Sequence, residues 1–495
     1  MIGAATAAQV RAAEAAVAAR LPAGTLMQRA ATALAVECAG ALRAAAGGVS
    51  GRRVVVLAGA GDNGGDALFA AALLARRGAG VLVLLTSDRS HAAGLAAARA
   101  AGCRVRALTA ADTAPGGACA GADLLLDGVV GIGGRGGLRA PLDALPATSA
   151  DRVAGPVVVA VDLPSGLDAD TGAVTGTVLS ADLTVTFGTA KPAHLLGPAA
   201  GRCGRLVVAD IGVAGELPEP VVRRIEPADV AAAWRRPVPG DDKYSRGVVG
   251  VVAGGPDYTG AALLAVDAAV RAGAGMVRYL GPEHPAELVR HHRPEAVPGA
   301  GRVQAWVLGP GVSPDDEEQQ GRVRAALTSG EPAVVDAGAL AGLPPQLGPA
   351  HVLTPHAGEL SRLLGLLGED ADRAAVEADP AAAARRAADL TGATVLLKGT
   401  VTTVAAVDGR LLTAAAAPPW LATAGAGDVL AGLLGTMLAA RAAELGEHPE
   451  RAADVAAAAA VLHGRAAALA SAGGPVAAAD VAEALPAALT SLPGW

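Results

Sequence analysis

The chain has 495 residues, of which 52% are hydrophobic, 18% are charged and only 2% are aromatic, and this composition predicts a globular protein with more than one core. Its net charge of −7 and its short basic clusters argue against a nucleic-acid-binding protein. The four cysteines include no CxxC pair, which argues against a zinc site and against a disulfide framework.

The sequence carries no recognisable signal for export or for membrane insertion. A basic N-terminal stretch followed by an apolar run, the pattern of a signal peptide, is missing. The alanine-rich run after Asp454 is interrupted by His463 and Arg465 and is too short to span a bilayer. We therefore expect a cytoplasmic protein with no membrane partner and no nucleic-acid partner.

In the first half, short apolar segments alternate with helical stretches. The segments that read as strands are RVVVLAG from Arg53, VLVLLT from Val81, DLLLDGVVG from Asp123, PVVVAVD from Pro156, LTVTFG from Leu183 and RLVVADIG from Arg205. This alternation predicts a parallel sheet covered by helices on both faces. Ligands bind such sheets at the carboxyl ends of the strands, where Asp66, Asp127 and Asp162 fall.

Residues 213–240 break this pattern, because they are rich in proline and charge, and they are predicted to be a linker. A second α/β series begins with GVVGVVAGG at Gly247 and ends in a long helical region after Gly425. The two halves share no clear internal repeat. We therefore expect two different α/β domains, over residues 1–212 and 241–495.

Three loops of the first half are expected to converge on one cleft. They are GAGDNGGD from Gly59, DGVVGIGGRGG from Asp127 and VDLPSGLD from Val161. Glycines at the start of a helix let backbone N–H groups approach a phosphate. Asn63, Asp127 and Ser165 offer oxygen ligands for a hard cation. The structural alternatives are a plain strand-to-helix turn at Gly59 and a turn-capping role for Asp162.

These motifs, together with FGTAKP from Phe187 and LMQRA from Leu26, resemble the NAD(P)H-hydrate epimerase family over residues 1–212. The resemblance implies a Rossmann-like three-layer domain, potassium bound by Asn63, Asp127 and Ser165, and Asp162 as the catalytic carboxylate. Lys191 is expected either to steady a developing negative charge or to be a solvated surface lysine. The family's commoner residues are Asn at Asp62 and Gly at Ala67. The residues implied to contact the hydrated nucleotide are Asp62, Asn63, Gly64, Gly65, Asp66, Gly131, Ile132, Gly133, Gly134, Arg135, Gly136, Gly137 and Asp162.

The second half carries its own strand-end motifs. AGAGD from Ala424 precedes an apolar helix, so its glycines can form an anion hole and its acid can act as a base. LKGTVT from Leu397 offers a lysine and hydroxyls, and TPHAGE from Thr354 brings a histidine and an acid into a helix. The alternatives are helix capping by His356 and by Asp428.

With KYSRG from Lys243, AGGPDYTGAALL from Ala253 and HGRAA from His463, these motifs resemble the ADP-dependent NAD(P)H-hydrate dehydratase family over about residues 228–490. The resemblance implies a ribokinase-like α/β domain that uses Mg²⁺ with ADP. Departures from the family pattern are Ala424, Ala426 and Gly338. The residues implied to hold ADP are Lys398, Gly399, Thr400, Val401, Thr402 and Gly427. Those implied to line the hydrate site are Ala261, Gly311, His356 and Asp428.

Together the two resemblances imply an enzyme that interconverts the R and S forms of hydrated NADH and NADPH (NADHX and NADPHX) and dehydrates the S form. ADP is consumed, giving AMP and phosphate, with Asp428 as the base of the dehydratase. We expect small-molecule substrates and a homo-oligomer. The alternative is a small-molecule kinase of the ribokinase fold with a non-catalytic, nucleotide-binding N-terminal domain.

Overall fold

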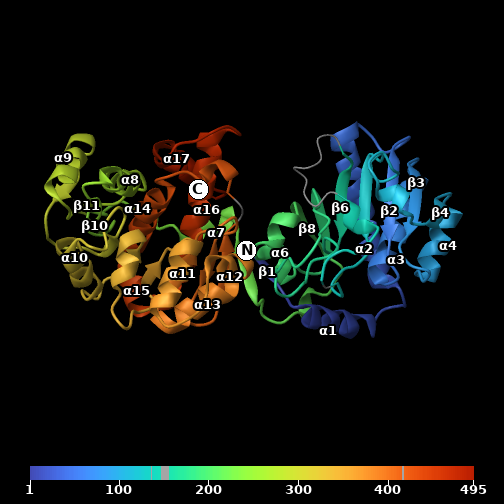
Figure 1. Ribbon diagram of the computed structural model, residues 1–495, viewed down its shortest axis with the longest axis horizontal. Helices are drawn as coiled ribbons and strands as arrows, with labels where there is room; N and C mark the ends of the chain where they lie inside the picture. The colour runs from blue at the N-terminus through green and yellow to red at the C-terminus, as the bar shows by residue number, and fades with distance from the viewer. Residues whose placement is uncertain (135, 146–154, 415–416, 495) are drawn as a thin grey trace. The chain divides into compact units, whose positions relative to one another are not determined.

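The computed structural model describes residues 1–134, 136–145, 155–414 and 417–494 (Figure 1). The chain divides into two compact units, one of which spans Gly3–Val222, while the other runs from Arg223 to the C-terminal end and includes Met1–Ile2. Each unit is built on a sheet of its own, with helices packed against it. The prediction of α/β folds in both halves is confirmed.

The sheet of the N-terminal unit has seven strands in the order β4-β3-β2-β5-β6-β7-β8, and all of its neighbouring strands are parallel. In chain order this is the 3-2-1-4-5 arrangement of a Rossmann fold, continued by two further strands. Its strands are β2 (Arg53–Ala58), β3 (Gly80–Leu85), β4 (Arg104–Ala107), β5 (Leu124–Gly128), β6 (Val157–Val161), β7 (Leu183–Phe187) and β8 (Arg205–Ala209).

Side chains that alternate along the strands bury both faces of this sheet. Val54 and Val56 belong to a core cluster on the α2 and α3 face, whereas Val55 and Leu57 belong to a second cluster on the other face. Continuous apolar strands are therefore explained by two covered faces. The helices of the unit are α1 (Ala7–Ala18), α2 (Thr25–Ala46), α3 (Asp62–Arg76), α4 (Ala92–Ala100), α5 (Ala110–Thr113) and α6 (Pro192–Leu195), with 3₁₀ turns η1 (Leu142–Ala144), η3 (Ala199–Arg202) and η4 (Ala214–Glu216).

The second sheet has eleven strands in the order β1-β9-β18-β17-β16-β15-β14-β13-β10-β11-β12. The run from β16 through β17 to β18 is antiparallel, and β18 pairs in parallel with β9. Its strands are β1 (Ile2–Ala4), β9 (Val222–Ile225), β10 (Val248–Val252), β11 (Met276–Tyr279), β12 (Val297–Pro298), β13 (Ala305–Leu308), β14 (Ala333–Val335), β15 (His351–Leu353), β16 (Thr394–Leu397), β17 (Thr403–Ala405) and β18 (Leu411–Ala414).

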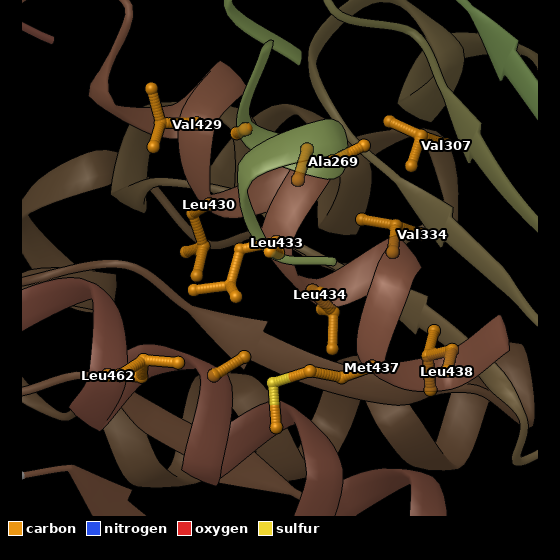
Figure 2. Close-up of a cluster of buried hydrophobic side chains, with 14 of the residues drawn as sticks. Ala269, Val307, Val334, Val429, Leu430, Leu433, Leu434, Met437, Leu438 and Leu462 are labelled. Carbon is orange, nitrogen blue, oxygen red and sulfur yellow. The ribbon is translucent and has the colours of Figure 1, made fainter. Parts of the chain in front are cut away.

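A helix at the centre of this unit, α14 (Ala426–Ala439), is buried on nearly every side (Figure 2). Its packing in the core fixes the position of its N-terminus. Gly432 and Gly435 let it approach its neighbours closely, because a Cβ at either position would meet Ala265 O at 2.1 Å or Val307 Cγ2 at 2.3 Å. The remaining helices are α7 (Pro227–Ala233), α8 (Thr259–Arg271), α9 (Glu283–His292), α10 (Glu317–Leu327), α11 (Ala357–Leu366), α12 (Arg373–Ala378), α13 (Pro380–Thr391), α15 (Ala442–Glu447), α16 (Ala452–Ser471) and α17 (Ala478–Thr490), with 3₁₀ turns η5 (Ala337–Gly342), η6 (Pro419–Leu421) and η7 (Pro449–Arg451).

One helical stretch of the described chain, Pro449–Ser471, is long and apolar enough to cross a membrane by length and composition alone. Of its most apolar window, 78% is buried inside the unit. Its α16 part packs against α14 and α17 and contributes to the central core. The stretch therefore has the surroundings of a core helix.

The segment predicted as a linker, residues 213–240, is largely structured. Within it, β9 pairs with β18 through Arg223 opposite Leu412 and Ile225 opposite Ala414. Val230 of α7 is fully buried in the core of the C-terminal unit. The boundary therefore lies between Val222 and Arg223. The prolines and charges that suggested a linker flank a short strand with only two buried residues, a pattern too brief to stand out in the sequence.

Candidate functional sites

In the N-terminal unit, the glycine-rich turn that opens α3 lies beside the end of β5. A Cβ at Gly59 would lie 2.0 Å from Val129 O, and one at Gly64 would lie 2.1 Å from Gly59 O. Only glycine fits at these two positions, because the obstructing atoms belong to the backbone. The turn sits between β2 and β5, where the strand order reverses and where open α/β sheets bind their ligands.

Asp127 at the end of β5 and Ser165 form a buried pair. Ser165 donates to the Asp127 carboxylate through its N–H at 2.8 Å and through Oγ at 2.6 Å. The hydroxyl oxygen of Ser165 also accepts from Val130 N at 3.1 Å. Burial raises the pKa of Asp127 to about 6, although these hydrogen bonds oppose the shift. A nearby cation would favour the charged carboxylate.

Asn63 and Asp162 both lie beside Gly131, in the loop that follows Asp127. A Cβ at Gly131 would lie 3.0 Å from Asn63 Oδ1 and 3.2 Å from Asp162 Oδ2. Asn63 Nδ2 is buried and has no hydrogen-bond partner among the described residues. No group of three or more His, Cys, Asp or Glu side chains suited to a metal ion occurs in the described part of the chain. One carboxylate with an amide and a hydroxyl oxygen is a donor set of hard oxygen ligands with a low charge.

Asp162 is held in an uncommon backbone conformation. Its φ is +64°, and Leu163 N donates to Val161 O at 2.7 Å, which closes a γ-turn around it. Its carboxylate accepts from Lys191 Nζ at 2.5 Å and from Thr186 Oγ1 at 2.8 Å. Burial would raise the pKa of Asp162, but the Lys191 charge and these hydrogen bonds outweigh it and lower the pKa. Backbone strain of this kind is concentrated at functional sites.

Of the two alternatives for Lys191, the structure excludes a solvated surface lysine. Lys191 is 1% exposed and donates to Asp162, to Thr186 and to Phe187 O. The sequence alone offered no measure of this burial. The lysine precedes a four-residue helix whose His194 bonds Asp162 O at 2.8 Å.

A second carboxyl, Asp66, lies on the first turns of α3, and its surroundings shift its pKa in the opposite direction to that of Asp162. Burial raises its pKa well above the usual range, and the charges of Asp162, Asp62 and Glu14 add to the rise. Its Oδ1 atom is buried without a partner among the described residues. Glu14 of α1 also has a raised pKa, through burial first. Sequence reasoning missed Glu14, which stands in an alanine-rich helix without a motif.

The other predicted residues of this unit are placed as follows. Ile132 O accepts from Arg11 at 3.2 Å, and Gly137 packs its Cα against Gly176 in a left-handed conformation. Arg135 lies outside the described residues. The family departure at Ala67 is accommodated, because its Cβ faces Gly128, where any Cβ would lie 2.5 Å away.

In the C-terminal unit, Asp428 lies on the first turn of α14, behind the left-handed residue Gly425. Its pKa is raised to about 7, first by burial and then by the negative charges of Asp336 and Glu359, while Lys398 opposes the rise. A carboxyl group with a pKa near neutrality is suited to accept a proton under physiological conditions.

Beside it, the partly buried Lys398 and the buried Asp336 form an ion pair at the ends of β16 and β14. Lys398 Nζ lies 2.8 Å from Asp336 Oδ1 and 3.9 Å from Glu359 Oε2. Burial alone would lower the pKa of Lys398, but the charges of Asp336 and Glu359 raise it. A Cβ at Gly427 would lie 3.3 Å from the ammonium. Sequence reasoning missed Asp336, although it ends a strand in the same way as Asp162.

His356 caps α11, as the structural alternative proposed. Its Nδ1 accepts from Gly358 N at 3.1 Å, and Glu359 Oε2 accepts from His356 N at 2.8 Å. The ring remains half-exposed, and His356 forms a backbone bridge with Lys398. The cap therefore places an imidazole at the rim of the Lys398 and Asp428 cluster.

Close packing brings the remaining predicted positions to the same edge. A Cβ at Gly311, which has a φ of +66°, would lie 2.8 Å from Ala261 Cβ. The segment Lys398–Thr402 forms the exposed turn between β16 and β17. Gly338, a departure from the family pattern, is required locally, because a Cβ there would lie 1.9 Å from Val312 O. His463 of α16, another residue without a predicted role, is buried, and its pKa is lowered to about 4 by burial and then by Lys398.

Comparison with known proteins places this geometry in a family. Residues 249–487 match the family described as NAD(P)H-hydrate dehydratase, and residues 23–193 match the YjeF-related protein N-terminus. A bifunctional NAD(P)H-hydrate repair enzyme of Mycobacterium tuberculosis is 47% identical over 442 residues, which cover 87% of this chain and 88% of that protein. The chain belongs to the bifunctional NAD(P)H-hydrate repair enzymes.

Two further repair enzymes of this family show the range of similarity. The enzyme of Mycobacterium leprae is 46% identical over 88% of both chains, and that of Corynebacterium glutamicum is 35% identical over 80% of both. Among solved structures, the ADP/ATP-dependent NAD(P)H-hydrate dehydratase from Bacillus subtilis, co-crystallised with ATP/Mg²⁺, is 27% identical, covers 55% of this chain and 99% of its own, and has a TM-score of 0.49. The predicted resemblances to the epimerase and dehydratase families are confirmed for this repair enzyme.

Proposed function

We propose that the N-terminal unit epimerises NADHX and NADPHX and that the C-terminal unit dehydrates their S forms at the expense of ADP. The observation that carries the proposal is Asp428, a partly buried carboxyl with a pKa of about 7 at a glycine-rich helix start beside the Lys398–Asp336 pair. Membership of the bifunctional repair family supports the assignment of one activity to each unit.

In the dehydratase, Asp428 takes the proton from the C6 hydroxyl while that oxygen attacks the β-phosphorus of ADP. The bond from the β-phosphorus to the bridging oxygen breaks, and AMP leaves. The ring nitrogen lone pair then expels phosphate from C6, and loss of a proton from C5 restores the C5–C6 double bond. Lys398 neutralises phosphate charge, and the backbone around Gly427 supplies N–H donors.

Mg²⁺ bound with the nucleotide would reduce the phosphate charge further. Such an ion needs only one or two protein carboxylates besides the phosphates, and Asp336, which lies beside Lys398, offers one. We propose that the turn Lys398–Thr402 lies against ADP, and that Ala261, Gly311 and His356 line the hydrate.

In the epimerase, Asp162 and Asp66 form a carboxyl pair whose pKa values are pushed apart. Lys191 holds Asp162 ionised, so Asp162 can take the hydroxyl proton as the C6–N bond opens. Asp66, whose pKa burial raises well above its usual range, is the candidate to give a proton to a leaving C6 oxygen. Both routes invert C6, and environments that separate two pKa values are typical of acid and base partners.

We propose that Asn63, Asp127 and Ser165 hold potassium. The buried charge of Asp127 and the neighbouring neutral oxygens fit a monovalent cation. The ion would fix the loop from Val129 to Gly131 against the hydrated ring. Homo-oligomerisation and a cytoplasmic location stay predictions, which light scattering and cell fractionation would test.

The test is recovery of reduced cofactor from a mixture of both hydrate epimers with saturating ADP. Complete return of NADH absorbance, with one AMP formed per NADH, supports both activities. A return that stops when the S epimer is exhausted refutes the epimerase assignment. Release of a stable phosphorylated product without NADH would instead support the kinase alternative.

A further inference from the structure

The strand order of the N-terminal unit indicates in which direction a bound dinucleotide would cross the sheet. Asp162, proposed to act on the hydrated ring, follows β6, and Asp127 of the proposed potassium site lies in β5, whereas β3 lies on the far side of β2. With strands 4.7–4.9 Å apart, the ends of β3 and β6 are separated by about 14 Å. Dinucleotides cross Rossmann sheets in this direction, with the diphosphate at the first helix. The adenosine half therefore belongs at the end of β3.

An open groove with a volume of about 870 Å³ lies at this place. It begins at the glycine-rich turn and continues over the segment after β3 and along α4. Neither the catalytic proposal nor the sequence motifs of the N-terminal unit account for it beyond Gly61. The groove is lined by Ala60, Gly61, Asp88, Arg89, Ser90, Ala92, Leu95, Ala96 and Arg99.

Two arginines of the groove have no carboxylate partner within the described ranges. The Arg89 side chain and the Arg99 side chain are both exposed, whereas Arg106 of the same unit is paired with Asp112. Ser90 adds a hydroxyl beside them. Guanidinium groups recognise phosphate through paired hydrogen bonds. Because neither arginine is bound to a carboxylate, a phosphate can bind them without first displacing one.

The segment that carries Arg89 is fixed to the helix that starts at the glycine-rich turn. His91 caps α4 by accepting from Gly94 N at 3.1 Å, and its ring packs edgewise on Phe69 with centroids 5.7 Å apart. A Cβ at Gly65 would lie 3.0 Å from the His91 ring. These contacts fix the position of the Arg89 segment relative to the N-terminus of α3.

We propose that this groove binds the adenosine ribose and its 2′-phosphate, with Arg89 and Arg99 on the phosphate, so that epimerisation prefers NADPHX to NADHX. The inference rests on the proposed epimerase function and names its preferred substrate. Asp88 also lines the groove and would accept from ribose hydroxyls. The two arginines outnumber this single carboxylate, and the balance favours a ligand with the additional phosphate.

The kinetic test uses the full chain with the R epimers as substrates and saturating ADP, so that the second unit converts each S epimer formed into absorbing product. Arg89→Ala and Arg99→Ala should each raise KM for NADPHX about tenfold, with KM for NADHX and both kcat values changed less than about twofold. Arg104→Ala, an exposed arginine on β4 outside the groove, is the matched control and should change neither. Equal rises in KM for both substrates would overturn the proposal.

Calorimetry with 2′,5′-ADP and 5′-AMP separates this inference from the activity itself. The parent chain should bind 2′,5′-ADP about tenfold more tightly than 5′-AMP, and the two arginine variants should lose that difference. Any binding of the two probes at the nucleotide site of the C-terminal unit is the same in the parent and in the variants. The difference in affinity between parent and variants therefore reports the groove alone. Equal affinity for the two probes in the parent refutes the phosphate subsite, even if epimerisation is observed. Discrimination without any epimerisation refutes only the proposed function.

Discussion

Replacing Asp428 by asparagine tests the chemistry of the C-terminal site most directly. Asparagine keeps the size of the side chain, and α14 has no side-chain capping hydrogen bond that the substitution would remove. It cannot take the C6 hydroxyl proton. We expect dehydration of the S epimer to fall by about 10²–10⁴-fold, the usual contribution of a general base. Epimerisation depends on the other unit and should persist.

The same substitution should stabilise the protein at neutral and alkaline pH. The pKa of Asp428 is raised from 3.8 to about 7, so ionising it in the folded state opposes folding. Below pH 4 the carboxyl is protonated in both states, and the penalty grows until pH 7, where it reaches at most about 4 kcal/mol. Asparagine carries no such penalty. The variant should therefore melt several degrees higher at pH 8 and show no gain near pH 4.

The assay pairs NADH recovery from pure S hydrate with thermal melting across this pH range and ADP affinity by calorimetry. Asp389→Asn, an exposed position on α13, is the control and should change neither rate nor melting temperature. ADP affinity should be kept or increased, because a negative charge beside Lys398 is removed. A variant that retains more than about a tenth of the parent rate would show that Asp428 is not the base.

Three further outcomes are expected. The kcat/KM for dehydration should fall below about pH 7 as Asp428 becomes protonated. Asp336→Asn should move this fall to lower pH, because it removes a like charge that raises the pKa of Asp428. pH–rate profiles of the parent and the variant check both expectations. Asp127→Asn should weaken epimerisation while dehydration of the S epimer continues, as assays on pure R and pure S substrate would measure. A chain that begins at residue 228 should melt at a lower temperature than one that begins at residue 219, because it lacks β9 and its pairing with β18; melting curves followed by circular dichroism compare them.

The strand-end rule predicted much of the N-terminal site. Asp127 and Asp162 follow buried parallel strands, and the structure brings both close to the glycine-rich turn. The same rule applied to VVDAGAL would have found Asp336, but no glycine motif follows that strand to draw attention to it. Attention to motifs alone therefore misses carboxylates whose partner, here Lys398, comes from another loop.

Burial is the property that the sequence did not predict. Lys191 lies in the FGTAKP motif, but only the folded chain shows that it is buried against Asp162; Glu14 lies in no motif, and only the folded chain shows that its pKa is raised. The linker prediction failed for a related reason, since β9 presents four residues with two buried and is recognised only by its neighbour β18. Short elements take their identity from tertiary pairing rather than from local sequence.

The two units reach a similar electrostatic arrangement with different sheets. Each places a lysine–aspartate ion pair at strand ends, Lys191 with Asp162 and the partly buried Lys398 with Asp336. Each sets a further carboxyl near the start of a glycine-rich helix, where burial and the charge of the pair's aspartate raise its pKa. The Lys191 ammonium lowers the pKa of Asp162, and in each unit the charge of the paired aspartate adds to the raised pKa of the further carboxyl. Proton transfer at C6 of a hydrated nicotinamide ring needs an acceptor within reach of that carbon, and each unit supplies a carboxylate for it, Asp162 in the first and Asp428 in the second.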